Sequence, residues 1–274
     1  MKATLYSLPR ITDPRGNLSF FQNQIPIPFK IAKVQWIYDV PGGSTSYNSE
    51  THETEEFIIA LSGSFDIVTD DSVKKETFHM NLSYNGLLIP KGVKRTIENV
   101  STNSIALIIT SSENEESKQQ RDIVDSKNLH YVHDCNVIEL CKHTSDGKGN
   151  YSVVRNNHEI PFAVNRVYFL YDVPAGESRG GHAHKSLNQM LFAVSGSFKV
   201  ELDDGNVKRS ITLNRPNQGL LIKPGIWRTL DDFSSGSVCL VLASKEYDES
   251  DYIREYDDFV TLRNEKENEK NHNK

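Results

Sequence analysis

An internal repeat constrains the fold of this chain more than any other feature of its sequence. When the sequence is laid over itself so that Asp13 meets Asp146, the two copies run to Ser111 and Ser244 without a gap. About a third of the aligned positions are identical. Two copies at so long a period indicate a duplicated domain, because solenoid repeats are shorter and more numerous.

Each copy has the residue pattern of short β-strands. Phe198, Val200 and Leu202 alternate with charged residues, and Asp203–Gly205 then supplies a hairpin turn. Similar runs, divided by turn residues every 8–12 positions, fill both copies. Many short strands of regular spacing predict an all-β chain in which each copy forms a β-sandwich or β-barrel.

The composition along the chain predicts the domain limits. We expect an N-terminal barrel over 1–135 and a C-terminal barrel over 136–262, joined through the polar stretch Glu113–Lys142. Asp251–Phe259 is the best helix candidate, since three aromatic residues there share one helical face. The almost wholly polar residues 263–274 predict a disordered tail.

Charge and hydropathy exclude several functions. The net charge is −6 and the pI about 5.9, so no basic surface for nucleic acid is expected. The longest apolar runs, such as Val238–Ala243, are far too short for a membrane span, and no secretion leader opens the sequence. Cys135, Cys141 and Cys239 have neither disulfide nor zinc spacing, which predicts reduced thiols and a cytoplasmic protein.

The segment between Gly176 and Gly196 carries the strongest chemical signal. His182 and His184 are two residues apart, so on a β-strand both side chains would project to the same side. Two adjacent imidazoles suit either metal binding or acid–base chemistry. The alternative is a pair of structural histidines bonded to their neighbours.

These residues resemble the motifs of the cupin superfamily. Gly176, His182, His184, Gln189 and Gly196 match the first cupin motif, with an amide where the acidic metal ligand belongs. Gly225–Arg228 matches the second motif, with arginine where histidine is usual. An arginine offers no lone pair and repels a cation, so we expect no metal.

Further segments are similar to the metal-free dTDP-4-keto-6-deoxyglucose 3,4-ketoisomerases. The segments that carry this likeness are Arg166–Pro174, Arg179–Lys185, Leu202–Gly205, Pro224–Trp227 and Tyr247–Tyr256. The resemblance implies two tandem jelly-roll barrels, a bicupin, and an isomerase without a cofactor. It also implies a dTDP-linked 4-keto-6-deoxy sugar as the substrate, in deoxysugar biosynthesis for O-antigen, lipopolysaccharide or S-layer glycans.

Moving a ketone from C4 to C3 requires one proton to leave C3 and one to reach C4. We expect His184 to shuttle this proton. His182 would position the His184 side chain or act as a second acid–base group. Arg179 would stabilise the oxyanion or bind diphosphate. Tyr168 would donate to a substrate oxygen, or be an ordinary strand aromatic. The residues expected to bind the substrate are Arg228, Arg15, Gln189 and Tyr171.

The first copy has lost these candidates. His182, His184, Arg179 and Tyr168 align with Ser49, Thr51, Ser46 and Gln35, and His52 is one residue out of phase with the histidine pair. Arg95 does match Arg228, so the first pocket could keep some affinity for anions. We therefore expect a degenerate barrel beside an active one.

The opening of the first copy suggests an exchange of strands. Asp13–Asn17 reads Asp-Pro-Arg-Gly-Asn, a family-like opening, whereas Asp146–Asn150 has lost its proline and arginine. We expect Asp13–Asn17 to cross over and help shape the second pocket, with Arg15 near the substrate. The alternative is that Arg15 merely belongs to a surface turn. The chain would then be an intramolecular pseudo-dimer of barrels that could pair further as a homodimer.

Three rival functions are compatible with the same residues. A related cupin could epimerise the same substrate at C3 and C5 while its ketone stays at C4. A metal-dependent dioxygenase would need a bound metal ion. A non-catalytic module would bind the sugar nucleotide without changing it.

Overall fold

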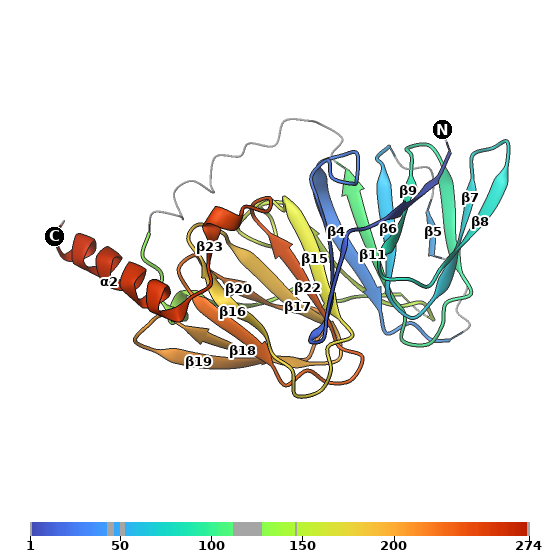
Figure 1. Cartoon of the computed structure of the whole chain (residues 1–274). Coiled ribbons are helices and arrows are strands. Elements are labelled where there is room, and N and C mark those ends of the chain that lie inside the picture. The colour runs from blue at the N-terminus through green and yellow to red at the C-terminus, as the bar shows by residue number, and fades with distance from the viewer. Residues whose placement is uncertain (1, 43–46, 50–52, 112–127, 146, 273–274) are drawn as a thin grey trace.

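The computed structural model describes residues 2–42, 47–49, 53–111, 128–145 and 147–272. These form two β-barrels that lie side by side, with a single α-helix projecting from the second barrel (Figure 1). This confirms the all-β fold of two tandem jelly-roll barrels with a C-terminal helix. In the described part of the chain, no helix is long and apolar enough to cross a membrane.

The described residues of the first copy form eleven strands. They are β1 (Thr4–Ser7), β2 (Arg10–Asp13), β3 (Gly16–Gln22), β4 (Ile31–Tyr38), β5 (Tyr47–Ser49), β6 (Glu56–Ser62), β7 (Phe65–Asp70), β8 (Lys75–Met80), β9 (Asn85–Ile89), β10 (Lys94–Glu98) and β11 (Ile105–Ser111).

Residues 128–145 and 147–272 form twelve further strands and three helical segments. They are η1 (Val132–Asp134), β12 (Val137–Glu139), β13 (His143–Ser145), β14 (Gly149–Arg155), β15 (Arg166–Tyr171), β16 (Arg179–His184), β17 (Gln189–Ser195), β18 (Phe198–Asp203), β19 (Lys208–Leu213), β20 (Gln218–Ile222), β21 (Trp227–Asp231), β22 (Val238–Ala243), η2 (Glu249–Asp251), β23 (Tyr252–Ile253) and α2 (Tyr256–His272).

Each barrel consists of one large and one small antiparallel sheet. In the first barrel the orders are β1-β9-β6-β11-β4-β14-β13 and β5-β10-β7-β8. In the second barrel they are β12-β20-β17-β22-β15-β3-β2 and β19-β18-β21-β16-β23. The two large sheets therefore each include strands from the other copy.

This exchange is reciprocal. Strand β3 pairs with β15 of the second barrel, with Phe21 opposite Val167, and β14 pairs with β4 of the first barrel, with Tyr151 opposite Ile37. The dark blue N-terminal segment in Figure 1 runs from the first barrel onto the second. The predicted crossing of Asp13–Asn17 is confirmed. Since each sheet would otherwise end in an open edge, the exchange also covers β4 and β15.

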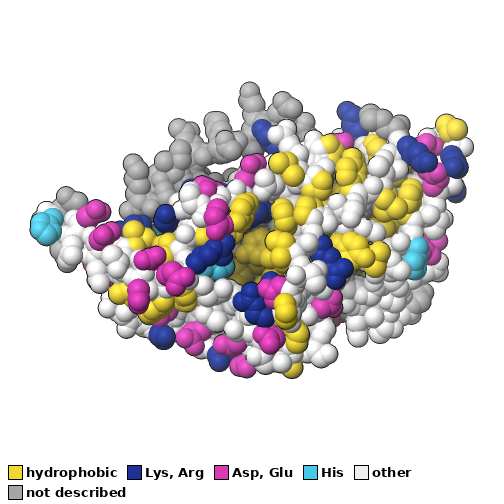
Figure 2. All heavy atoms as spheres, viewed as in Figure 1, with side chains coloured by type: hydrophobic (Ala, Val, Ile, Leu, Met, Phe, Trp, Pro, Cys, Tyr) yellow, Lys and Arg dark blue, Asp and Glu magenta, His cyan; other side chains and the backbone are white. Residues whose placement is uncertain are grey.

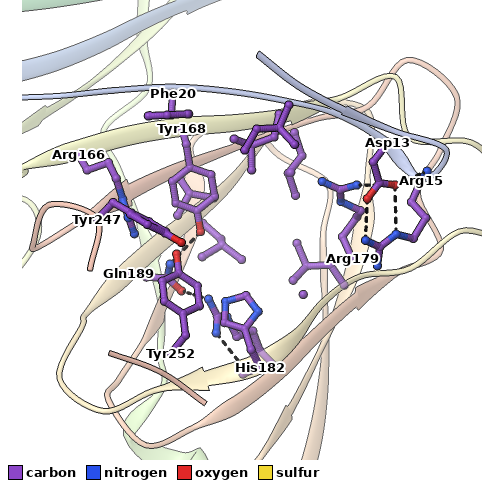
Figure 3. A pocket seen from close by; sticks show the side chains of 18 of the residues that line it. Asp13, Arg15, Phe20, Arg166, Tyr168, Arg179, His182, Gln189, Tyr247 and Tyr252 are labelled. Atoms are coloured by element: carbon purple, nitrogen blue, oxygen red, sulfur yellow. Dashed lines mark hydrogen bonds and ion pairs between the residues drawn. The ribbon is translucent and has the colours of Figure 1, made fainter. Parts of the chain in front are cut away.

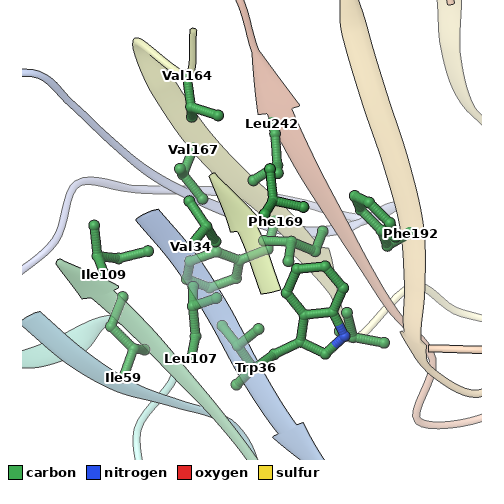
Figure 4. Close-up of a cluster of buried hydrophobic side chains, with 14 of the residues drawn as sticks. Val34, Trp36, Ile59, Leu107, Ile109, Val164, Val167, Phe169, Phe192 and Leu242 are labelled. Atoms are coloured by element: carbon green, nitrogen blue, oxygen red, sulfur yellow. The ribbon is translucent and has the colours of Figure 1, made fainter. Parts of the chain in front are cut away.

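The exchanged strands enclose a hydrophobic core shared by both copies. Val34 and Trp36 on β4 pack with Val167 and Phe169 on β15, and all four side chains are fully buried (Figure 4). The Trp36 ring lies 4.7 Å from the ring of Phe192, and its Nε1 donates a hydrogen bond to a backbone carbonyl of the second copy, at 2.9 Å. The two barrels thus share one interior.

The C-terminal segment differs from the prediction. Residues 256–272 form helix α2 where we expected a disordered tail from 263, and the segment before it forms η2 and β23 instead of a helix from Asp251. Two side chains anchor the helix: Phe259 is buried 5.6 Å from the ring of Trp227, and Arg263 is buried and donates to the carbonyl of His130. Polarity alone suggested disorder, but these two contacts hold the helix against the barrel. Residues 273–274 lie outside the described part.

Replacing Trp36 with alanine tests whether the two barrels share one interior. Truncating a fully buried tryptophan should lower the free energy of unfolding by about 3–5 kcal/mol. Because its contacts join both copies, denaturant unfolding should remain a single transition at lower denaturant. The control Val73→Ala, at a 93% exposed position, should change the free energy by less than about 0.5 kcal/mol. Two separate transitions, with only one displaced, would contradict a shared core.

Candidate active site

The second barrel contains a cavity of about 500 Å³. Figure 2 shows this face hollowed near its centre, with hydrophobic and Lys or Arg side chains around the hollow. The lining comes from both copies: Ile11, Asp13, Arg15, Leu18 and Phe20 from β2, β3 and their turn, and Arg166, Tyr168, Leu170, Arg179, Gly180, His182, Gln189, Leu191, Arg228, Leu230, Val241, Tyr247, Tyr252 and Arg254 from the second copy. The exchange of strands therefore builds part of the site.

Strand β15 supplies one wall of the cavity. Its alternation turns Arg166, Tyr168 and Leu170 toward the cavity and the residues between them toward the shared core. Tyr171 belongs to the second set: it is buried in the core, with its hydroxyl 3.1 Å from the Ser19 hydroxyl. The expectation that Tyr171 binds substrate is therefore wrong. It lies three residues from Tyr168, which places the two on opposite faces of the strand.

The two histidines are adjacent but have different access. Their rings are 5.1 Å apart and nearly perpendicular, and only His182 lines the cavity. His184 is 3% exposed, and its Nδ1 lies 2.9 Å from a carboxylate oxygen of Asp251. His182 therefore faces the cavity, whereas His184, which we expected to shuttle the proton, does not line it. An irregularity in β16 between Gly180 and His182, with β23 paired onto Ala183 and His184, separates the environments of the two rings.

Burial keeps both imidazoles neutral. Desolvation, followed by the positive charge of Arg228, lowers the pKa of His182 far below that of a free histidine. The same two causes lower the pKa of His184 to about 3, although its hydrogen bond to Asp251 acts in the opposite direction. A neutral His182 facing the cavity has a lone pair and can accept a proton.

A row of three hydrogen-bonded side chains lies beside His182 (Figure 3). Gln189 donates through Nε2 to the Tyr168 hydroxyl at 2.8 Å and accepts through Oε1 from Arg228, also at 2.8 Å. Arg228 donates in addition to the backbone carbonyl of His182 at 2.8 Å. Burial lowers the pKa of the guanidinium and raises that of the Tyr168 phenol to about 12, so Tyr168 keeps its proton.

This group of side chains does not suit a metal ion. The positions beside His182 and His184 are taken by the amide of Gln189 and the cationic Arg228, which are bonded to each other. Among the described residues, no cluster of three or more histidine, cysteine or acidic side chains has metal-site geometry.

A carboxylate from the first copy lies at one end of the cavity. Asp13 accepts hydrogen bonds from the backbone and side chain of Arg15, and its Oδ1 lies 3.4 Å from a guanidinium nitrogen of Arg179. The hydrogen bonds from Arg15 lower the pKa of Asp13 to about 2. Arg15 belongs to the turn between β2 and β3 and also lines the cavity (Figure 3). The expected turn position and the expected position at the second pocket are therefore both found.

Several lining residues were missed by the sequence reasoning. Arg166 is 3% exposed, and its Nε and Nη2 have no hydrogen-bond partner among the described residues. The rings of Tyr168 and Tyr247 flank its guanidinium at 5.5 Å each. Arg166 lies two residues before Tyr168, so strand alternation alone would have placed it in the same pocket. Tyr252, from β23, closes the cavity over both histidines, with ring centroids 5.0 and 4.3 Å away.

The first copy has a different arrangement at the matching positions. Glu56 aligns with Gln189 and Arg95 with Arg228, and this pair forms a buried ion pair with Nε and Oε2 2.8 Å apart. The carboxylate meets the positive charge of Arg95, which argues against the anion affinity we expected there. The counterparts of Arg179, His182 and His184, namely Ser46, Ser49 and Thr51, have side chains outside the described residues.

Three comparisons with known proteins relate the chain to a family and to individual relatives. The family model FdtA, described as WxcM-like, C-terminal, matches twice, over residues 1–130 and 133–264. The TDP-4-oxo-6-deoxy-alpha-D-glucose-3,4-oxoisomerase of Aneurinibacillus thermoaerophilus is 48% identical over 114 residues, which cover 42% of this chain and 82% of that protein.

Two solved 3,4-ketoisomerase structures each match about half of the chain. A 3,4-ketoisomerase from Helicobacter canadensis is 41% identical and covers 48% of this chain and 98% of its own, with a TM-score of 0.47. A mutant of the 3,4-ketoisomerase QdtA from Thermoanaerobacterium thermosaccharolyticum, in complex with TDP-4-keto-6-deoxyglucose, is 36% identical. That match covers 49% of this chain and 97% of the other, with a TM-score of 0.48.

The pKa of His184 predicts how stability depends on pH. The unfolded chain takes up a proton near pH 6.5, whereas the folded chain does so only near pH 3, so stability is full above pH 6.5 and falls as the pH drops below it. When the pH falls from 7 to 5, protonation of this residue in the unfolded chain should lower the free energy of unfolding by about 2 kcal/mol.

The variant His184→Asn, whose amide can still donate to Asp251, should show a shallower pH dependence when unfolding by urea is measured at both pH values. His133→Asn, at a side chain that is 79% exposed, is the control and should follow the parent chain. An unchanged slope in His184→Asn would contradict a buried neutral imidazole.

Proposed function

Because this chain belongs to the FdtA family, we propose that it is a sugar-nucleotide 3,4-ketoisomerase. It converts a dTDP-linked 4-keto-6-deoxyhexose into its 3-keto isomer, as a step of deoxysugar biosynthesis. One observation carries the proposal: His182 faces the cavity with Tyr168 and Arg228 beside it. The chemistry needs a base, a hydrogen-bond donor and a positive charge around one sugar.

The reaction moves protons and leaves the carbon skeleton intact. His182 takes the proton from C3, the C–H electron pair forms a C3–C4 double bond, and the carbonyl pair of C4 moves onto its oxygen. The same histidine then returns a proton to C4. The electron pair of the C3–C4 double bond takes this proton at C4 while a lone pair of O3 forms the C3 carbonyl. The hydroxyl proton of O3 passes to O4, so the ketone now stands at C3 and a hydroxyl at C4. One base on one face of the sugar serves both carbons.

The neighbours of His182 favour the intermediate. Negative charge develops on the oxygens of C3 and C4, where a buried guanidinium and a phenol hydroxyl are strong stabilising groups. Arg228 is 2% exposed, so water screens its charge little. His184 does not line the cavity; with Asp251 it packs behind His182 and holds that ring in place.

The remaining arginines suit the diphosphate of the substrate. Arg166 is buried at the cavity wall, and Arg179 and Arg15 share the single carboxylate of Asp13. Within the described part of the chain, Arg166 forms no ion pair and two guanidinium groups share Asp13, with the charge of Glu177 a weaker influence on Arg15. Anionic phosphates would supply the missing negative charge. A cytoplasmic location and further pairing as a homodimer remain predictions, the former consistent with three free cysteines.

Replacing His182 tests the assignment of the base. His182→Asn should lower kcat by at least about 10³-fold while dTDP still binds, because only the proton-transfer group is lost. Product formation from dTDP-4-keto-6-deoxyglucose is followed by proton NMR, with a 3-aminotransferase to trap the 3-keto isomer. His133→Asn is the matched surface control.

Three outcomes would contradict the proposal. A His182→Asn variant with parental turnover would show that another group is the base. In heavy water, deuterium at C5 with the ketone still at C4 would instead identify a 3,5-epimerase, and tight binding without any product would identify a binding module.

Replacing Arg166 tests the phosphate assignment. Arg166→Met keeps the apolar stem and removes the charge, so KM should rise about 10-fold or more while kcat changes little. Steady-state kinetics and calorimetry with dTDP measure the two effects. A fall in kcat with unchanged KM would place Arg166 at the reacting sugar instead of at the phosphates.

A further inference from the structure

The direction of each hydrogen bond in the row from Arg228 to Tyr168 is fixed by chemistry. A guanidinium has only donors, so Gln189 must present its carbonyl Oε1 to Arg228, at 2.8 Å. The other end of the amide, Nε2, then faces the Tyr168 oxygen at 2.8 Å and can only donate to it. The Tyr168 oxygen is therefore an acceptor in this row.

This acceptor role leaves the hydroxyl hydrogen of Tyr168 free to point elsewhere. The residue lines the cavity beside His182, and the phenol keeps its proton because burial raises its pKa. A substrate oxygen in the cavity is the acceptor that this hydrogen can reach.

We propose that Gln189 is a positioning residue that makes Tyr168 a hydrogen-bond donor to the reacting sugar oxygen and leaves the charge of Arg228 uncancelled. The proposal rests on the proposed isomerase function and deepens it. It assigns Gln189 an action through its two neighbours, in place of the direct substrate contact expected from the sequence.

At the matching position the first barrel has a carboxylate in place of the amide. There Glu56 replaces Gln189, forms a buried ion pair with Arg95, and is accompanied by Gln35 where the second barrel has Tyr168. A carboxylate has only acceptors. At position 189 it would accept from Arg228 and from Tyr168 together, turning the phenol hydrogen away from the sugar and cancelling the positive charge.

The difference between an amide and a carboxylate thus decides what the cavity can stabilise. With Gln189, the cavity presents a donor and a cation to an enediolate. With glutamate, the same cavity would present a neutral ion pair. The fold tolerates both, because each barrel of this chain carries one of them.

The test compares Gln189→Glu, Tyr168→Phe and the double variant. Losing a preorganised donor to an oxyanion costs about 10²-fold, so Gln189→Glu should lower kcat by about that factor with KM changed only a few-fold. Tyr168→Phe should be strongly impaired in the parent chain but should add less than about threefold in the Gln189→Glu background. Calorimetric binding of dTDP to each variant confirms an intact fold.

Two further variants complete the design. Gln189→Met is similar in length but has no donor or acceptor. It leaves the charge of Arg228 without a carboxylate partner, so its kcat should fall less than that of Gln189→Glu. If the glutamate variant does not fold, Gln189→Met takes its place in the test. The reverse exchange in the first barrel, Glu56→Gln, should leave kcat of the folded enzyme unchanged.

The proposal is overturned if Gln189→Glu keeps kcat within twofold, or if Tyr168→Phe costs the same factor in both backgrounds. These outcomes differ from a failure of the proposed function. In that case the parent chain itself would form no 3-keto product.

Discussion

The reciprocal exchange of strands is the constraint on which the rest of the structure depends. Strand β3 extends the large sheet of the second barrel and β14 extends that of the first, so neither copy forms its complete large sheet alone. The exchange creates the core around Trp36 and carries Asp13 and Arg15 to the cavity. The first copy thus has a structural role whatever its chemistry: its strands complete the large sheet of the second barrel, share its core and line part of the cavity.

The two barrels differ in charge at one pair of matching buried positions. Both bury an arginine at the same position of the fold, but Arg95 is ion-paired with Glu56, whereas Arg228 has the neutral Gln189 as its partner. A buried cation bonded to a neutral group remains available to a developing anion. Under the proposed function, the exchange of an amide for a carboxylate at this position is one of the side-chain differences that separate the two barrels.

The two-barrel fold and the crossing of the N-terminal segment could be predicted from the sequence, because the repeat, the strand alternation and the opening Asp13–Asn17 are visible as sequence patterns. The failures have physical causes. The roles of His182 and His184 depend on an irregular strand and on β23, which comes from a distant part of the chain. Tyr171 does not line the cavity because it is three residues from Tyr168 on β15, and side chains an odd number of residues apart on a strand point to opposite faces. The helical tail was missed because Phe259 anchors an otherwise polar segment.

The most direct test of a site assembled from both copies is to divide the chain between residues 112 and 127 and to measure turnover of the separate and recombined pieces. The account predicts that the piece from residue 128 gains full turnover only when the first piece is added, at one-to-one stoichiometry. The second piece alone, monomeric and as active as the intact chain, would contradict it.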